Sequence, residues 1–293
     1  MFGTYHVFKL NLKLKNKSLE EIFESRETTT QEYLVELGFS TKIIEGFFKP
    51  FFAGIFLEPN LKTSSRMFEF VYKMFGEGYA AIPQLGIGEI SNQLKSKLKH
   101  TKFVFNCEVE AVTKDHILIR SGEKKSHNGV IIAANASSLI SSLEKEEIAW
   151  KGCMCLNFEV DKTNIPKNTI ALIAEPGNFA NNLYAYSDTS TGKTILSVTT
   201  LKHSEKSDKE IIEAIQVEVK KYAGSSQVSY IHHYRINQAL PDIQSLKMTA
   251  LPGESEVLDN VFLAGDYLFN GSLNAAMESG RLAAQGMILK RKG

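Results

Sequence analysis

The sequence predicts an α/β (α+β) protein in which helices and short strands build more than one layer. Three observations lead to this prediction. Helix-start signals follow one another quickly within residues 1–79, and short apolar runs separated by turn residues fill residues 103–134. The chain then closes with a short apolar run, a Gly-Asp turn and a long helix-forming stretch. A chain of 293 residues is long enough to bury a sizeable core and to form one large or two ordinary domains.

Composition and charge exclude several classes of protein. Hydrophobic residues make up 43% of the chain and charged residues 23%, as in ordinary folded proteins. The formal net charge is +1, so electrostatics gives no reason to expect nucleic acid as a partner. No run approaches the roughly 18 apolar residues of a membrane span, and the first residues lack the basic-then-apolar order of a secretory signal. We therefore expect a cytoplasmic protein.

The cysteines predict neither disulfides nor a metal site. The chain has three cysteines, Cys107, Cys153 and Cys155. An odd number gives no complete set of disulfide pairs, which fits a reducing compartment. Cys153 and Cys155 stand two apart in an apolar run, so on a strand both face one side. Structural zinc needs about four ligands. Packing in the core is the better interpretation, and we expect no metal.

Two capping boxes open helices near the start of the chain. Ser18 is followed three residues later by Glu21, and Thr29 by Glu32, the spacing that satisfies free N–H groups at a helix start. Ser40 predicts a third helix, which we expect to stop near Lys49 because proline follows it. A further helix is predicted over residues 65–75, ending at two glycines.

The segment Phe47–Leu57 is the most aromatic part of the sequence. One interpretation is a helical layer of the core. The other is a surface that contacts a membrane or an apolar substrate, which would place the protein at the periphery of a membrane. The run is too short, and too interrupted by Lys49 and Pro50, to span a bilayer.

Strands and one amphipathic helix are predicted in the middle of the chain. Runs of β-forming residues occupy positions 103–105, 109–112, 117–119 and 130–134, with turn residues between them. Further strands are expected around 153–160, 169–174, 183–186, 194–200 and 228–235. A helix over 207–222 carries an apolar stripe. His232 and His233, on the last of these strands, face opposite sides and are either substrate-facing groups or satisfied structural histidines.

The C-terminal stretch organises the rest of the chain. Val261–Ala264 reads as a buried strand that Gly265 and Asp266 stop, and Ser272 can cap a helix running to about Leu289. The N-terminus of that helix offers unpaired N–H groups and a positive dipole end to an electron-rich ligand. Many small residues on this helix predict that something packs very close to its backbone: Ala275, Ala276, Gly280, Ala283, Ala284 and Gly286.

This stretch resembles a known family. Ala264-Gly265-Asp266 and Gly271 through Arg281 are similar to the C-terminal FAD signature of the flavin amine oxidase, protoporphyrinogen oxidase and phytoene desaturase superfamily. The resemblance implies that Asp266 hydrogen-bonds the ribityl or pyrophosphate part of FAD, with the Gly265 turn allowing close approach. It also implies that the backbone of Ser272, Leu273 and Asn274 faces the flavin pyrimidine edge. A helix N-terminus there favours negative charge on the reduced ring.

Earlier segments extend the resemblance. Residues 54–59 and 80–88 look like the family's middle segment, which leads into a helix of the FAD domain, and Gly129–Asn135 looks like its return strand. The resemblance places Val109 against the FAD adenine. Gly86 and Gly88 could pass for a degenerate dinucleotide fingerprint, but no convincing strand precedes them and the third glycine is missing.

The resemblance implies a division of the chain into four segments. Residues 1–79 form the helical part of a substrate domain and 80–144 the adenine side of the FAD domain. Residues 145–240 form the sheet and helix of the substrate domain, and 241–293 the flavin side. The expected fold is thus an incomplete Rossmann-like FAD domain interleaved with a substrate domain of mixed β-sheet and helices. The family's glycine-rich first unit has no counterpart before residue 54, so we expect a truncated member or a fragment that alone binds FAD weakly or not at all.

The implied function is FAD-dependent removal of a hydride from a C–N or C–C bond of an amine or apolar substrate. No residue can be assigned as a catalytic base, and the oligomeric state is left open. One alternative is a non-catalytic protein that keeps the fold to bind an apolar molecule. Another is a membrane-surface desaturase or porphyrin-type oxidase that docks through Phe47–Leu57.

Overall fold

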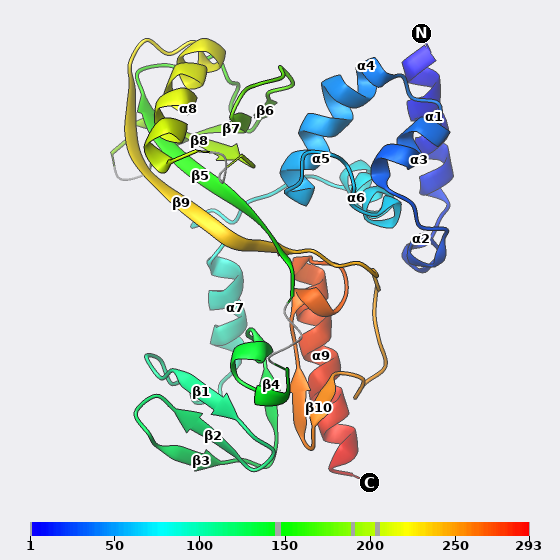
Figure 1. Cartoon of the computed structure of the whole chain (residues 1–293), viewed down its shortest axis with the longest axis vertical. Helices are drawn as coiled ribbons and strands as arrows, with labels where there is room; N and C mark the ends of the chain where they lie inside the picture. Colours follow the sequence, from blue (N-terminus) through cyan, green and yellow to red (C-terminus); the bar gives the residue numbers. More distant parts are fainter. Residues whose placement is uncertain (1, 144–147, 189–190, 203–205, 293) are drawn as a thin grey trace. The chain divides into compact units, whose positions relative to one another are not determined.

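A computed structural model describes residues 2–143, 148–188, 191–202 and 206–292. The chain separates into two compact units (Figure 1). Unit 1 contains residues 1–70 and 148–246, and unit 2 contains residues 71–147 and 247–293. We expected boundaries after residues 79, 144 and 240. The assignment of these segments to substrate and FAD domains stays a prediction.

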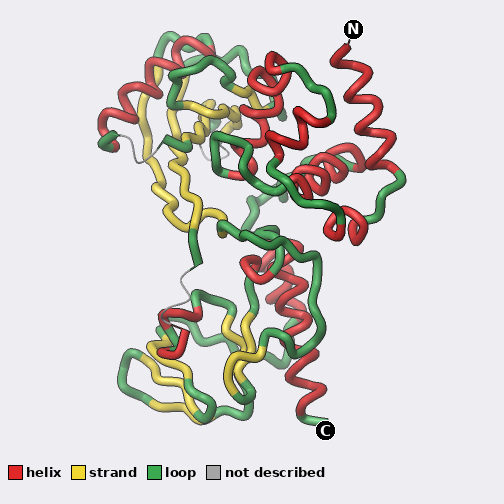
Figure 2. The backbone as a smooth tube through the Cα atoms, turned by 45° about the vertical axis from the view of Figure 1, so that its right-hand side comes forward, coloured by secondary structure: helices red, strands yellow, loops and turns green. Residues whose placement is uncertain are grey.

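Helices and loops make up the N-terminal part of unit 1, as Figure 2 shows. Both capping boxes are confirmed, since each cap hydroxyl accepts an N–H from the third helical residue, whose carboxylate in turn accepts the cap N–H. The helices α2 and α3 each begin at a side-chain cap, whereas α4, η1 and α5 follow one another without a loop. Their bounds are α1 Phe2–Lys15, α2 Leu19–Glu24, α3 Thr30–Glu36, α4 Thr41–Ile43, the π-helix η1 Ile44–Phe48, α5 Lys49–Phe56 and α6 Ser65–Glu77.

The expected helix stop at Pro50 is wrong. The chain stays helical through a π-turn, in which the Lys49 N–H bonds the Ile44 carbonyl five residues back, and Pro50 then occupies the first turn of α5. The π-turn changes the regular i→i−4 hydrogen-bond pattern directly before Pro50, which is where proline, lacking an N–H, would otherwise interrupt it. Leu57, in the left-handed conformation, ends the helix.

The aromatic segment Phe47–Leu57 is mainly core. Phe48, Phe52 and Phe56, spaced four residues apart, are at most 1% exposed and confirm the interpretation as a helical core layer. Phe47 lies on the other side of the helix and is 47% exposed.

The rest of unit 1 is a five-stranded antiparallel sheet with one helix packed on it. The strand order is β6-β7-β8-β5-β9. Ser207 caps α8, Gly224 ends it in the left-handed conformation, and its buried residues Ile211, Ile215 and Val219 pack on Leu156 and Phe158 of the sheet. The predicted strands and helix are confirmed. Their bounds are β5 Trp150–Val160, β6 Ile170–Leu172, β7 Ala180–Ser187, β8 Thr194–Thr200, α8 Asp208–Ala223 and β9 Val228–Pro241.

Unit 2 contains two three-stranded sheets and two principal helices. One sheet is antiparallel with the order β1-β2-β3, and the other, β10-β11-β4, pairs β11 with β4 in parallel. Val112, Ile132 and Val261 belong to one buried cluster, which joins the two sheets. The bounds are α7 Glu89–Lys97, β1 Val109–Val112, β2 His116–Ile119, β3 Lys124–Ser126, β4 Val130–Ile132, η2 Ala136–Ser138, η3 Ser141–Leu143, β10 Glu256–Leu258, β11 Val261–Leu263, η4 Asp266–Leu268 and α9 Leu273–Lys290.

The strand expected over residues 103–105 does not form. Phe103 and Phe105 are 40% and 66% exposed, and their rings stack at 6.3 Å with Lys95 over both. An apolar run becomes a strand only when a neighbouring strand satisfies its backbone. Within the described part of the chain, no strand pairs with this run.

Candidate functional site

The parallel pair β4–β11 brings two strand ends to one edge of a sheet in unit 2. Leu263 lies opposite Ile132, and the Ala264 N–H continues the ladder with a hydrogen bond of 2.9 Å to the Ile132 carbonyl. Ligands of open α/β sheets bind beyond the carboxyl ends of parallel strands. Gly265 and Asp266 follow β11 at that position.

The turn after β11 is built around Gly265. Its N–H donates to the buried Ser279 hydroxyl of α9 at 2.8 Å, which ties the turn to that helix. The backbone at Gly265 is extended (φ 167°), so the need for glycine is steric. A Cβ at this position would lie 2.2 Å from Cε1 of Tyr267.

Asp266 and Tyr267 present polar groups that the protein leaves unpaired. Among the described residues, no side-chain partner of Asp266 is found, whereas its backbone carbonyl accepts the N–H groups of Phe269 and Gly271. The Tyr267 hydroxyl is buried with no hydrogen-bond partner in the same part of the chain. Burial raises the pKa of Tyr267, and the neighbouring Asp266 charge adds to this effect.

The N-terminus of α9 opens next to this turn in the sequence. The Ser272 hydroxyl accepts the Ala275 N–H at 3.1 Å and donates to the Asn270 side chain at 2.7 Å. The preceding N–H groups, those of Leu273 and Asn274, belong to exposed residues at the positive end of an 18-residue helix. A carboxylate and helix N–H groups close together form a donor and acceptor set that fits the polar edge of a nucleotide cofactor.

Val109 occupies the first position of β1, in the same unit. It is partly buried against the cluster that contains Ile132 and Val261. The structure therefore places all six predicted cofactor residues in unit 2, with Val109 on a different sheet from the Gly265 turn.

The glycines at 86 and 88 do not form a phosphate loop. Gly86 has a positive φ of 96° and α7 begins at Glu89, but residues 80–85 form no strand. A dinucleotide fingerprint requires a strand leading into the turn.

One face of the unit 1 sheet carries a row of polar and aromatic side chains. Tyr184, Ser197, Asn157 and His232 lie opposite one another on four neighbouring strands, on the face away from α8. Asn157 Nδ2 and His232 Nε2 are 3.2 Å apart. The Tyr186 ring stacks on Tyr184 with centroids 6.3 Å apart. We call this set, together with Tyr234, the sheet face.

Most of the sheet face could not be predicted from the sequence, because strand register determines which side chains share a face. The only available signal was the alternation of polar with apolar residues over 153–160. Of the two histidines, His232 lies on the sheet face. His233 lies on the opposite side, where its Nε2 is 3.1 Å from the Asp208 carboxylate and its Nδ1 is 2.7 Å from the Tyr230 hydroxyl.

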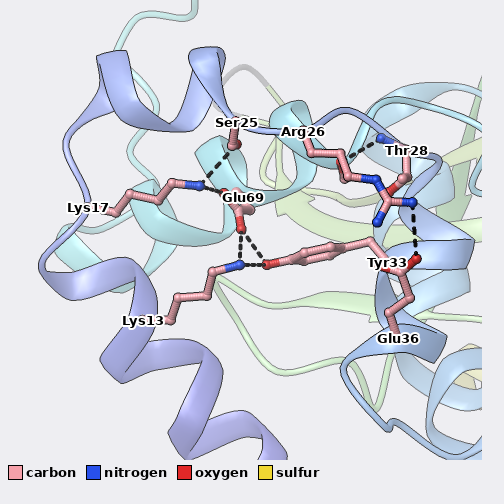
Figure 3. Close-up of a pocket in the computed structure, with 9 residues that line it drawn as sticks. Lys13, Lys17, Ser25, Arg26, Thr28, Tyr33, Glu36 and Glu69 are labelled. Atoms are coloured by element: carbon pink, nitrogen blue, oxygen red, sulfur yellow. Dashed lines mark hydrogen bonds and ion pairs between the residues drawn. The ribbon is translucent and has the colours of Figure 1, made fainter.

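Unit 1 also contains a small polar cavity of about 130 Å³ (Figure 3). Lys13, Lys17 and Tyr33 converge on the buried Glu69 from three different elements. The remaining lining residues are Ser25, Arg26, Thr28, Glu36 and Ser65. Because these charged groups pair with one another, the cavity holds helices together and does not present an unpaired reactive group.

Two kinds of site are absent from the described ranges. No group of histidine, cysteine or acidic side chains there could hold a metal ion. No helix in those ranges has the length and apolar character needed to cross a membrane.

These features describe an α/β protein with a strand-turn-helix edge in unit 2 and a polar sheet face in unit 1. The model of the flavin containing amine oxidoreductase family matches residues 7–288. The chain belongs to this family of flavin-dependent oxidoreductases. No curated protein sequence matches it.

Solved structures share the fold at low sequence identity. The PF1083 protein of Pyrococcus furiosus is 14% identical with a TM-score of 0.68, over 95% of this chain and 73% of that chain. Cyclohexylamine oxidase from Brevibacterium oxydans is 12% identical with a TM-score of 0.62, over 97% and 74%. Putrescine oxidase bound to putrescine is 10% identical with a TM-score of 0.57, over 97% and 72%.

Proposed function

We propose that this chain is an FAD-dependent oxidoreductase that oxidises the C–N bond of an amine. The observation that carries the proposal is the turn from β11 through Gly265 and Asp266 to α9. There a carboxylate without a side-chain partner among the described residues and the N-terminus of α9 follow a parallel strand pair in the sequence. Two proteins of similar fold, cyclohexylamine oxidase and putrescine oxidase, support an amine as substrate.

We assign the cofactor contacts to unit 2. Asp266 would accept hydrogen bonds from hydroxyls of the ribityl or ribose chain, and Gly265 would let them approach. The N–H groups of Leu273 and Asn274, with Ser272 as the cap, would stabilise negative charge on the ring. Val109 would contact the adenine side through its backbone. Bound FAD would supply the acceptor for the hydride removed from the substrate carbon.

We assign the substrate to the sheet face of unit 1. Tyr184, Tyr186 and Tyr234 offer aromatic rings, which attract ammonium groups. Asn157 and His232 offer hydrogen-bonding groups within the same row. An amine with an apolar body suits such a mixed surface.

FAD binding is the first test. We expect weak or absent retention, because the sequence contains no complete G-x-G-x-x-G turn. A fluorescence titration of the full chain with FAD is therefore more informative than a spectrum after desalting. Asp266→Ala should raise the Kd at least tenfold, since a hydrogen bond to a charged group is worth about 1.5–3 kcal/mol. Asp115→Ala, in an exposed turn of the same unit, is the matched control.

Three outcomes would each change part of this interpretation. An unchanged Kd in Asp266→Ala would remove Asp266 from the site. Full flavin occupancy on purification would contradict weak retention. No FAD binding at any concentration would favour the non-catalytic alternative.

The substrate assignment is tested with a panel of amines and an artificial electron acceptor in the presence of excess FAD. Tyr186→Leu should raise KM by roughly three- to tenfold, as expected for loss of one cation–π contact. Tyr230→Leu is the matched control, because Tyr230 has a similar exposure, 40% against 38%, but lies on the opposite side of the sheet. Equal effects of the two substitutions would exclude the sheet face as the substrate surface.

A further inference from the structure

Helix α1 carries apolar side chains on two of its faces. Leu10 and Leu14 are 1% and 2% exposed and anchor the helix to unit 1. Tyr5, Phe8 and Leu12 are 63%, 65% and 55% exposed. Their spacing of three and four residues places them on one side of the helix. We call these three residues the α1 stripe.

Lysines border the α1 stripe. Lys9 follows Tyr5 by four residues and Lys15 follows Leu12 by three, so each lies beside the stripe, and both are exposed. The helix contains no aspartate or glutamate. On this helix, the only charged side chains beside the α1 stripe are therefore positive. Such a surface is complementary to one that has an apolar interior and a negatively charged exterior.

The α1 stripe is held in a fixed orientation. Lys13, on the same helix, donates hydrogen bonds to Tyr33 at 2.8 Å and to Glu69 at 2.9 Å. Lys17, just beyond the helix, donates to Ser25 and Glu69. These bonds and the two buried leucines fix which side of α1 faces outward. A helix of 14 residues is about 21 Å long, too short to span a bilayer but suited to lying along its surface.

We propose that α1 docks this protein on the surface of an anionic lipid bilayer. Tyr5, Phe8 and Leu12 enter between the headgroups, and Lys9 faces the negative charges there. A second copy of the chain is a poorer occupant, because two such helices would bring lysines against lysines. This inference uses residues outside the cofactor and substrate assignments, so it can fail while they hold.

The test is co-sedimentation of the full chain with vesicles of phosphatidylcholine alone and with added phosphatidylserine. We expect binding to the anionic vesicles that weakens as salt rises. Phe8→Ser with Leu12→Ser should lower the partition coefficient roughly tenfold or more. The matched control changes two equally exposed apolar residues elsewhere in unit 1, Ile170→Ser with Val217→Ser, and should bind like the wild type.

Two further variants separate the rival explanations. Lys9→Glu should lower binding to anionic vesicles and leave the low binding to neutral vesicles unchanged. Phe47→Ser tests the prediction that Phe47–Leu57 contacts the membrane. Loss of binding in Phe47→Ser but not in the α1 double variant would overturn the proposal. The proposal would also be overturned if the wild-type chain did not bind vesicles. It would likewise be overturned if light scattering showed a wild-type dimer that became monomeric in the variant Phe8→Ser with Leu12→Ser.

Discussion

Lys17 donates a hydrogen bond to the carboxylate of Glu69, 52 residues further along the chain (Figure 3). Glu69 has only 3% of its side chain exposed, and Lys17 16%. Lys13 and Tyr33 bond the same carboxylate. A buried charge is tolerated only when it is paired and fully hydrogen-bonded, so Glu69 joins α1, α3 and α6 into one arrangement.

Glu69→Gln should lower the free energy of unfolding of unit 1 by about 3 kcal/mol, because breaking a buried pair leaves its partner charge uncompensated. Trp150 is the only tryptophan and lies on β5 in unit 1, so its fluorescence during urea unfolding reports on this unit. Lys209→Met is the control. Its ion pair with Glu213 is exposed and 4.0 Å long, and its loss should cost less than about 1 kcal/mol. Equal effects would mean that the Glu69 cluster adds nothing beyond a surface pair.

The stabilisation by Glu69 should disappear in acid. Burial pushes the pKa of Glu69 up, but hydrogen bonds from Lys17, Tyr33 and Lys13 outweigh it and hold the pKa below its ordinary value of 4.5. A group with a lowered folded-state pKa contributes stability above its unfolded pKa and loses it as pH falls through the folded one. The difference in unfolding free energy between wild type and Glu69→Gln should therefore be full at pH 6 and shrink below about pH 4.5. A difference that stays constant down to pH 3 would contradict this.

Local signals in the sequence predicted much of the fold. The capping boxes at Ser18 and Thr29 involve contacts within four residues. The apolar stripe predicted over 207–222 likewise depends on spacing within the helix, and α8 forms over Asp208–Ala223. The two errors have different causes. Pro50 continues a helix because a π-turn precedes it, which is a local change of hydrogen bonding that no residue pattern announced. Residues 103–105 form no strand because strand formation depends on a distant partner, and no described strand pairs with them.

The residues of the candidate site likewise differ in whether the sequence could predict them. Gly265, Asp266 and Ser272 are close in sequence, and their strand-turn-helix arrangement could be predicted. The row from Tyr184 to His232 could not, because the register of four strands, with a bulge beside Asn157, decides which side chains share a face.

Two glycines of α9 should respond in opposite ways to alanine. A Cβ at Gly286 would lie 2.6 Å from the backbone nitrogen of Gly253, whereas a Cβ at Gly280 would meet nothing within 4 Å. Gly286→Ala should therefore lower stability by about 1–3 kcal/mol through overpacking. Gly280→Ala should raise it by about 0.5–1 kcal/mol, because alanine is the better helix former. Hydrogen exchange of α9 measures both, and protection rising in both variants would show that Gly286 has no close neighbour.

Gly265→Ala should weaken FAD binding without unfolding unit 2. The new Cβ would lie 2.2 Å from Cε1 and 2.6 Å from Cδ1 of Tyr267, so either the ring moves or the turn that carries Asp266 shifts. The ring cannot move freely, because its hydroxyl is buried. We therefore expect the turn to shift, with a roughly tenfold higher Kd for FAD if the Asp266 hydrogen bonds are lost.

A second substitution isolates the cause. Tyr267→Ala in the Gly265→Ala background removes the obstacle and should recover part of the affinity, whereas Gly280→Ala alone should bind FAD like the wild type. If the double variant binds no better than Gly265→Ala, the contact with Tyr267 is not what makes glycine necessary. Close approach of the ligand to the backbone at residue 265 would then be the better explanation, because a Cβ would meet the ligand whether or not the ring is present.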